Sequence, residues 1–161
     1  MVRNMSDRNQ VDMRDMESRF GIERFLRSIG IKSESNYFMA EKSWRPTLQL
    51  RGSGASMWTY FSRKPYLLIV TDKELVLYDY LAKNQESQII FITFKELQQF
   101  EIEKLTPFKE YCLSFEYGKK YYFYIESEVI GEIEFSCVNF HHLYITLVTI
   151  TTFKASMLLI I

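Results

Sequence analysis

The segment that most constrains the fold of this chain is residues 66–80, with the sequence YLLIVTDKELVLYDY. Two apolar runs rich in β-branched residues flank a polar break of four residues, Thr71-Asp72-Lys73-Glu74. Each run has the length and composition of a strand, and the break has the composition of a turn. The segment therefore predicts a β-hairpin and favours a mainly β fold.

Strand patterns continue on both sides of this hairpin. The predicted strands cover residues 37–41 with an extension toward residue 50 left open, 66–70, 75–80, 88–92, 98–104, 111–117 and 121–126. Consecutive hairpins without helices between them predict an antiparallel meander rather than a parallel doubly wound sheet.

One of these strands and one of the turns allow more detailed predictions. In residues 98–104, Phe100 and Ile102 share one side while the alternating glutamates share the other, which predicts one face in water. Between the last two strands, the sequence Gly118-Lys119-Lys120 is predicted to close a short hairpin, with Gly118 supplying a positive φ where the turn requires it.

Helical spacing precedes the strands. From residue 12 to residue 29, apolar residues recur at helical intervals with a phase change at Gly21, and Gly30 is placed to end the helix in a left-handed conformation. The pattern predicts two short amphipathic helices, whose apolar stripe must be covered either by the β-domain or by another chain. We expect Phe20, Phe25 and Leu26 to contribute to hydrophobic association.

The last strand is followed by a second helical pattern, because the spacing of Val138, His142 or His141, Ile145 and Val148 is compatible with one helix. Residues 143–161 form an apolar tail with a single charge, Lys154. That lysine and several hydroxyl side chains oppose membrane insertion, so packing of the tail is favoured. The tail composition also permits a strand, which leaves open whether the helix ends before residue 149. Its candidate association residues are Leu158, Leu159 and Ile160.

The composition fits one intracellular domain. The chain has 161 residues, of which 47% are hydrophobic, so it can bury a core without disulfides. Its two cysteines, Cys112 and Cys137, are too few for a secreted disulfide framework, and no secretory leader pattern occurs at the N-terminus. We therefore expect a reducing, cytoplasmic setting, with attachment to a membrane surface as the alternative.

The net charge of zero conceals an asymmetry. Residues 1–64 hold 12 Lys and Arg against 7 Asp and Glu, whereas residues 65–161 hold 8 against 13. Candidate contacts for a partner or an anion are Arg45, Arg51, Arg63 and Lys64. The basic segment can equally dock on the acidic part of the same protein or remain solvated, and the sequence leaves these alternatives open.

No catalytic or cofactor motif is present. The glycine-rich segment 51–56 is not followed by Gly-Lys-[Ser/Thr], and Cys137 with His141 supplies only two of the four ligands of a structural zinc site. Asp72 and Asp79 are predicted to lie on opposite strand faces and cannot form a carboxylate pair. We therefore expect neither an enzyme nor a cofactor. Nucleic-acid binding is disfavoured because the aromatic hairpin 111–126 belongs to the acidic half.

Three segments resemble a known family. These are LLIVTDKELVLYD, the strand containing Phe100-Glu101-Ile102, and the hairpin YCLSFEYGKKYYFYIE before a helix containing Asn139-Phe140. Together, over residues 37–148, they resemble the bacterial pleckstrin-homology-like (PH-like) domains. The resemblance implies a partly open antiparallel β-barrel of about seven strands, capped by a C-terminal helix, with a role in binding or assembly. Eukaryotic relatives bind phosphoinositides through a basic loop, but the corresponding residues 47–64 lack its clustered basic pattern.

These patterns predict a mainly β (α+β) protein in three parts: a polar lead with amphipathic helices in residues 1–36, a PH-like domain in residues 37–148 and an apolar tail in residues 149–161. The expected function is noncatalytic, mediating protein–protein association or self-assembly through an unknown partner or a second copy. The alternative is peripheral binding to an anionic membrane through basic N-terminal residues and the tail.

Overall fold

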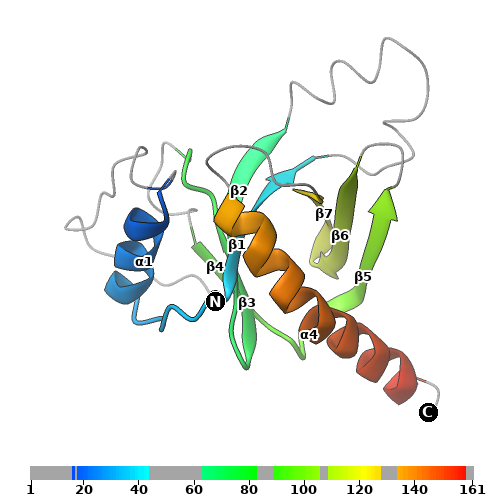
Figure 1. Ribbon diagram of the computed structural model, residues 1–161. Coiled ribbons are helices and arrows are strands. Elements are labelled where there is room, and N and C mark those ends of the chain that lie inside the picture. The colour runs from blue at the N-terminus through cyan, green and yellow to red at the C-terminus, as the bar shows by residue number, and fades with distance from the viewer. Residues whose placement is uncertain are drawn as a thin grey trace.

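The computed structural model describes Met16 and residues 18–43, 63–82, 89–105, 109–127 and 134–158, with side chains described as far as residue 149. These residues form an antiparallel sheet of seven strands with helices packed against it (Figure 1). The elements are α1 (Arg19–Ser28), β1 (Tyr37–Lys42), β2 (Lys64–Val70), β3 (Glu74–Tyr78), β4 (Ile89–Thr93), β5 (Gln98–Leu105), β6 (Glu110–Tyr117), β7 (Lys119–Glu126) and α4 (Glu134–Leu158). The prediction of a mainly β, antiparallel fold of seven strands with a C-terminal helix is confirmed, although β1 pairs with β7 and the consecutive strands β4 and β5 are not neighbours.

The hairpin of β2 and β3 forms as predicted, with Leu67 opposite Tyr78 and Val70 opposite Leu75. Thr71 organises its turn, because its Oγ1 accepts hydrogen bonds from the backbone N–H groups of Lys73 and Glu74. β3 ends at Tyr78, two residues before the predicted end.

Local turn chemistry accounts for the early end of β3. The Asp79 carboxylate accepts a hydrogen bond from the backbone N–H of Leu81, which turns the chain out of the strand. At the next predicted turn, Gly118 has φ +67° as expected, but Lys119 and Lys120 already belong to β7. Tyr117 is paired directly with Lys119, so the turn is tighter than predicted.

The sheet has the strand order β4-β3-β2-β1-β7-β6-β5 and is not closed into a barrel. Its two edge strands, β4 and β5, are nevertheless joined by the short segment from Phe94 to Leu97. An extended chain from Thr93 to Gln98 spans at most roughly 18 Å, so one end of β4 lies near one end of β5. The sheet is therefore strongly curved.

The two halves of the sheet meet at a narrow joint. β1 pairs with β2 along its whole length, but it pairs with β7 only through Glu41 and Lys42. Beside this joint α4 takes over hydrogen bonding to β1, because the Met39 N–H donates to Ser136 Oγ at 2.7 Å and Asn139 Nδ2 donates to the Tyr37 carbonyl at 3.0 Å. Both α4 side chains are buried. Side chains of α4 thus form hydrogen bonds with backbone groups of β1 that are not paired with β7.

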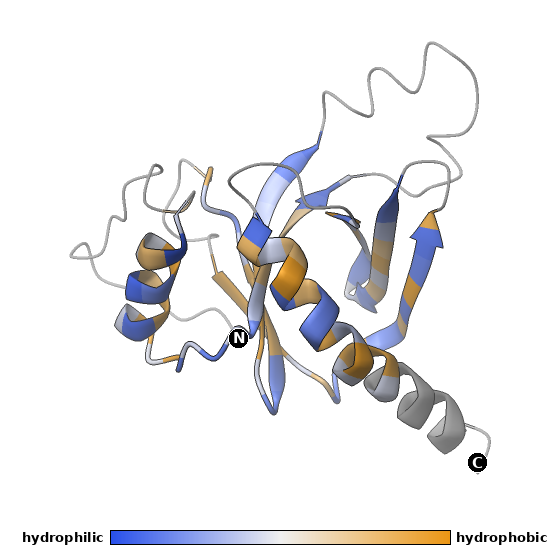
Figure 2. Ribbon diagram, in the orientation of Figure 1, coloured by the Kyte–Doolittle hydropathy of each residue, from blue (hydrophilic) through white to orange (hydrophobic). Residues whose placement is uncertain are grey.

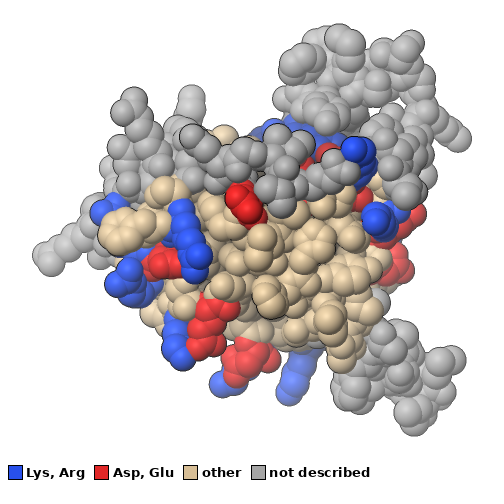
Figure 3. All heavy atoms as spheres, in the orientation of Figure 1, with Lys and Arg blue, Asp and Glu red and all other residues tan. Residues whose placement is uncertain are grey.

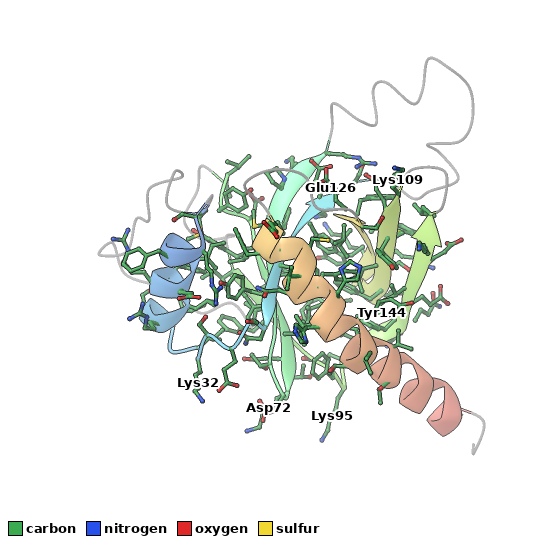
Figure 4. All side chains as sticks on the ribbon, in the orientation of Figure 1. Lys32, Asp72, Lys95, Lys109, Glu126 and Tyr144 are labelled. Atoms are coloured by element: carbon green, nitrogen blue, oxygen red, sulfur yellow. The ribbon has the colours of Figure 1, made fainter. Side chains whose placement is uncertain are left out.

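The inner face of the curved sheet holds the larger core. Every strand contributes to it, and α4 adds Phe140 and Leu147. Phe140 packs edge-on against Phe38 of β1 and contacts Tyr111 of β6, with ring centres 5.1 Å apart in each pair. Tyr144 lies on the side of α4 that faces β6 (Figure 4) and also packs on Tyr111. These contacts fix α4 across the sheet.

A second core lies on the outer face of β1 to β4, where α1 covers the sheet. It contains Ile22, Phe25 and Leu26 from α1, and Phe25 stacks on Tyr78 of β3 with ring centres 4.3 Å apart. The β-domain of the same chain therefore covers α1, which resolves one of the alternatives left open by the sequence. Of the longer helical pattern, residues 12–15 and 17 lie outside the described part.

Both ends of α1 follow from the sequence. Ser18 Oγ accepts a hydrogen bond from the backbone N–H of Gly21 and caps the N-terminus. At the other end Gly30 has φ +77°, its N–H donates to the Arg27 carbonyl, and the N–H of Ile31 donates to the Leu26 carbonyl. This is the double hydrogen-bond pattern of a Schellman cap, so the prediction for Gly30 is confirmed.

Candidate functional site

The structure separates the four predicted basic contact residues. Arg45 and Arg51 lie outside the described residues. Lys64 is exposed at the start of β2, as a contact residue should be. Arg63, immediately before it, is almost fully buried, with 5% of its side chain exposed. The expectation that Arg63 is presented to an anionic partner is therefore not supported.

Arg63 instead forms an internal ionic network. Its Nη1 lies 2.6 Å from Glu110 Oε1 and 3.0 Å from Glu41 Oε2, and its Nη2 lies 3.2 Å from Glu110 Oε2. The guanidinium also stacks over the Tyr124 ring at 4.7 Å. Burial opposes the charged guanidinium, but the hydrogen bonds from Arg63 to Glu110 and Glu41 outweigh it and raise the pKa of Arg63. Arg63 therefore anchors the start of β2 to β1 and β6.

A pocket of about 130 Å³ lies beside this network. Its lining includes three glutamates, together with apolar side chains from β1, β2 and β7 and the first turn of α4. The glutamates are Glu41, Glu110 and Glu126. Cys137 also lines the pocket, but burial first and then Glu126 raise the pKa of its thiol, which opposes formation of the nucleophilic thiolate. Cys137 is therefore not activated as a nucleophile.

Cys137 is close to His141, as the spacing of four residues predicts. The Cys137 sulfur lies 3.5 Å from His141 Nδ1, and the same nitrogen donates a hydrogen bond to the Cys137 carbonyl at 2.7 Å. Because Nδ1 carries the proton in that bond, it cannot accept the thiol proton. Within the described part of the chain, no group of three or more His, Cys, Asp or Glu residues is placed to hold a metal.

A lysine–tyrosine cluster, consisting of Lys42, Lys64, Lys119, Tyr66 and Tyr121, lies where β1 ends and β2 and β7 begin. The Lys42 ammonium lies 4.9 Å from the centre of the Tyr121 ring and 5.4 Å from that of Tyr66, and Lys119 lies 5.5 Å from the Tyr121 ring. Lys42 and Lys64 are directly opposite each other on neighbouring strands. The fold thus brings three lysines together, and two of them, Lys42 and Lys119, hold their ammonium groups over aromatic rings.

The electrostatics of this cluster favour an added negative charge. Burial first, and then Lys119 and Lys64, lower the pKa of Lys42, while Asp79 partly offsets these effects. An anion placed beside Lys42 would reverse the repulsion. Sequence reasoning found Lys64 but missed Lys42 and Lys119. The available signal was strand alternation, which puts Lys42 on the same side as the buried residues Phe38 and Ala40.

The predicted hydrophobic contact residues also have different environments. Phe20 is 68% exposed on α1. Phe25 and Leu26 are buried in the core beneath α1, so the expectation that they form an association surface is wrong, because α1 turns these positions toward the sheet. Leu158 is the last residue of α4, and nothing further is described of its side chain. Leu159 and Ile160 lie outside the described residues.

The outer face of α4 is the most unusual surface of the molecule. No Asp, Glu, Lys or Arg occurs from Phe135 to Phe153, and apolar residues recur along the described part of the helix (Figure 2). Val138 is 47% exposed and Ile145 is 74% exposed. Figure 3 shows a broad area without charged side chains on the face where α4 lies, with Lys, Arg, Asp and Glu around its margin.

Four exposed residues of α4 form a regular row. Val138, His142, Ile145 and Thr149 follow one another at intervals of four, three and four residues, and His142 and Thr149 are also exposed. We call this row the α4 seam. The spacing keeps all four side chains on one side of a helix, facing away from the core residues Phe140 and Leu147. The helix continues to Leu158, so it does not end before residue 149.

The two edges of the open sheet are less suited to pairing with another chain. At the β4 edge, the Glu96 carboxylate accepts hydrogen bonds from the backbone N–H and the hydroxyl of Thr93. At the β5 edge, the register with β6 shifts between Gln98 and Glu101, and Gln99 has φ +47°. The exposed glutamates of β5 add charge. Bulges and charged side chains of this kind discourage edge-to-edge association.

Comparison with known proteins finds no matching family model and no matching curated sequence. Among the helices described, none is long and apolar enough to cross a membrane. We therefore infer the function from the exposed surfaces of the molecule.

Proposed function

We propose that this chain is a noncatalytic interaction module that associates with protein through the outer face of α4. The main support is that the outer face of α4 presents Val138 and Ile145 to solvent, while no Asp, Glu, Lys or Arg occurs from Phe135 to Phe153. A surface helix of a soluble domain ordinarily carries charged residues on the face opposite its core stripe. Contiguous exposed apolar surface marks interaction sites.

The energetics favour covering this face. Burial of an aliphatic side chain such as Ile145 contributes about 1.5–3 kcal/mol when it passes from full exposure to full burial. Ile145 and Val138 retain much of that exposure in the isolated chain. His142 and Thr149, between and beside them, add polar groups, and none of the four residues is Asp, Glu, Lys or Arg. Association through α4 therefore gains apolar burial without desolvating a permanent charge.

We further propose that the module has the PH-like architecture, a partly open barrel capped by α4. Three observations support this: the unbroken antiparallel order of seven strands, the short connection between the edge strands β4 and β5, and the position of α4 across the joint between β1 and β7. Because one fold serves many functions, this architecture is compatible with the binding role but does not itself identify a partner.

The test of the association role compares three versions of the full chain, each immobilised at equal density and exposed to native lysate and to the same chain in solution. These are the unmodified protein, Ile145→Lys and the control Phe20→Lys. Both substitutions change an exposed apolar residue, but only the first places a charge on the α4 seam. We expect Ile145→Lys to lose partner protein that Phe20→Lys retains. Equal capture by all three would refute the α4 surface.

A second candidate function, binding to an anionic membrane surface, is favoured by the lysine–tyrosine cluster. Lys42, Lys64 and Lys119 converge there, and residues 44–62 between β1 and β2 contain two arginines and no acidic residue. Each basic residue near an anionic bilayer contributes about 1 kcal/mol.

Co-sedimentation with vesicles containing phosphatidylserine tests this candidate. Binding should weaken in Lys42→Gln/Lys119→Gln and at raised salt. It should persist in Lys95→Gln, whose side chain points away from the sheet at the turn after β4 (Figure 4). Binding that ignores both the substitutions and salt would exclude the lysine–tyrosine cluster as the membrane contact.

A further inference from the structure

We propose that the occupant of the α4 seam is a second copy of this chain, so that two α4 helices pair through the same residues. This inference rests on the proposed association function and makes it more specific. The seam residues are Val138, His142, Ile145 and Thr149.

The spacing of the seam is that of a helix which pairs with another helix. Intervals of four, three and four residues repeat the pattern by which side chains of one helix fill the gaps between side chains of another. α4 has 25 residues, so at 1.5 Å per residue it is about 37 Å long and presents the seam as a straight ridge. Ile145, the most exposed of the large hydrophobic residues described, stands near the middle of that ridge.

The charge distribution favours an identical partner. In a two-fold dimer the same patch occurs on both sides, so any charged side chain near the axis would face its own copy. The α4 seam carries no Asp, Glu, Lys or Arg, and therefore pairs with itself without like-charge repulsion. It also lacks the charged groups by which a surface selects a complementary, unlike partner. Among the described side chains, the large apolar residue Phe20 is also exposed on a helix, but it stands beside Arg19 and has Arg24 one turn further along α1.

The two edges of the sheet, at β4 and β5, are less suited to self-association than α4. Pairing through the β4 edge must displace the Glu96 carboxylate from Thr93, and pairing through the β5 edge must accommodate the bulge at Gln99. α4 needs no such rearrangement, because its seam residues already project from a rigid helix. The described surface thus leaves the helix as the better self-complementary element.

The size of the contact predicts a weak dimer. The seam from Val138 to Thr149 is about 17 Å long, so a strip about 10 Å wide covers about 170 Å², roughly a fifth of what each partner contributes to a standard stable interface. We therefore expect a weak dimer, with a dissociation constant of roughly 0.1–1 mM, rather than a permanent one. The chain should pass from monomer to dimer within the concentration range of an ordinary biophysical measurement.

Sedimentation velocity of the full chain from about 10 µM to 1 mM tests the proposal. The unmodified protein should shift toward twice its 19.3 kDa mass as concentration rises. Ile145→Lys should raise the dissociation constant at least about tenfold, because it replaces buried apolar surface by a charge that faces its own copy. Phe20→Lys should dimerise as the unmodified protein does. Matching thermal unfolding of the three proteins shows that the fold is unchanged.

Cross-linking locates the contact independently. Ile145→Cys places a reactive thiol on the seam, while the native Cys112 and Cys137 are buried. A short bis-maleimide should convert Ile145→Cys to a covalent dimer and leave the control Phe20→Cys monomeric. Dimerisation with no preference for position 145, or a monomer at about 1 mM, overturns the proposal. If the monomer still captures a different protein in an Ile145-dependent manner, the association function survives and only the identity of the partner is wrong.

Discussion

The side-chain amide of Asn139 in α4 donates a hydrogen bond to the backbone carbonyl of Tyr37 in β1, at 3.0 Å and across 102 positions of the sequence. The carbonyl lies on the part of β1 that β7 does not reach, since β1 and β7 are paired only at Glu41 and Lys42. Asn139 thus supplies to this carbonyl the hydrogen bond that a neighbouring strand supplies elsewhere in the sheet.

Substitution of Asn139 by Leu should destabilise the protein by about 1–3 kcal/mol, because it leaves the Tyr37 carbonyl buried without that donor. Urea unfolding at neutral pH measures the change. Thr149→Val is the matched control, since its hydroxyl donates only to a carbonyl of its own helix, that of Ile145, and we expect less than about 0.5 kcal/mol. Equal effects from the two substitutions would contradict the bridging role of Asn139.

The two phenylalanines of α1 should differ sharply in their contribution to stability. Phe25→Ala removes a buried ring stacked on Tyr78 and should cost about 3–5 kcal/mol. Phe20→Ala changes a residue that is 68% exposed and should cost less than about 0.5 kcal/mol. Parallel thermal or urea melts compare them, and a large loss at Phe20 would mean that its ring is covered in solution.

Removal of Arg63 should be more costly than removal of the whole ion pair. Arg63→Met leaves the buried Glu110 carboxylate without its guanidinium partner and should destabilise the fold by about 3–5 kcal/mol. The double substitution Arg63→Met/Glu110→Met should recover much of that loss, because no charge is then left buried. A double-mutant cycle measured by denaturant unfolding gives the coupling, and simple additivity of the two changes would argue against a tight pair.

Cys112 should resist thiol-modifying reagents in the folded protein. Burial is the main cause that raises the pKa of its thiol, to about 12, so the thiolate that reacts is scarce at pH 8. Ellman's reagent should label Cys112 at a negligible rate until denaturant is added. Cys112→Ala assigns the signal between the two cysteines. Rapid labelling of Cys112 in the native protein would show that its environment opens readily.

Stability should fall at alkaline pH. Burial raises the pKa of Cys112 to about 12 and also raises the pKa values of Tyr66 and Tyr124. A group whose pKa is raised in the folded state binds its proton more tightly there, so its contribution is fully present below the unfolded pKa and is lost as pH rises toward the folded value. We expect the free energy of unfolding to decrease from about pH 9 to pH 12. Stability that is constant over this range would contradict these raised values.

Local sequence patterns predicted the strands and the turns because their causes are local. The apolar runs on each side of Thr71 form β2 and β3, and Gly30 and Gly118 adopt the expected positive φ values. The exposed glutamates of β5 follow from alternation in the same way. In each case, neighbouring residues contain the information that determines the conformation.

The predictions that failed depended on contacts between distant segments. Arg63 was a candidate contact for a partner or an anion, with docking on the acidic part of the same protein as the open alternative. β1 and β6 bring Glu41 and Glu110 to it, so the alternative holds for this residue. Helical spacing correctly identified the apolar stripe of α1, but spacing alone cannot show that Phe25 meets Tyr78. The approach of Lys119 to Lys42 likewise requires the pairing of β1 with β7.

The separation of the two cores by the sheet has a consequence for the order in which the newly synthesised chain can fold. The buried members of the outer core all lie between Met16 and Phe91, so that core can assemble before the ribosome has added β5, β6 and β7. The inner core requires Phe140 and Leu147 and waits for nearly the whole chain. Vectorial synthesis therefore favours early docking of α1 on β1 to β4, with the inner face of these strands exposed until α4 arrives.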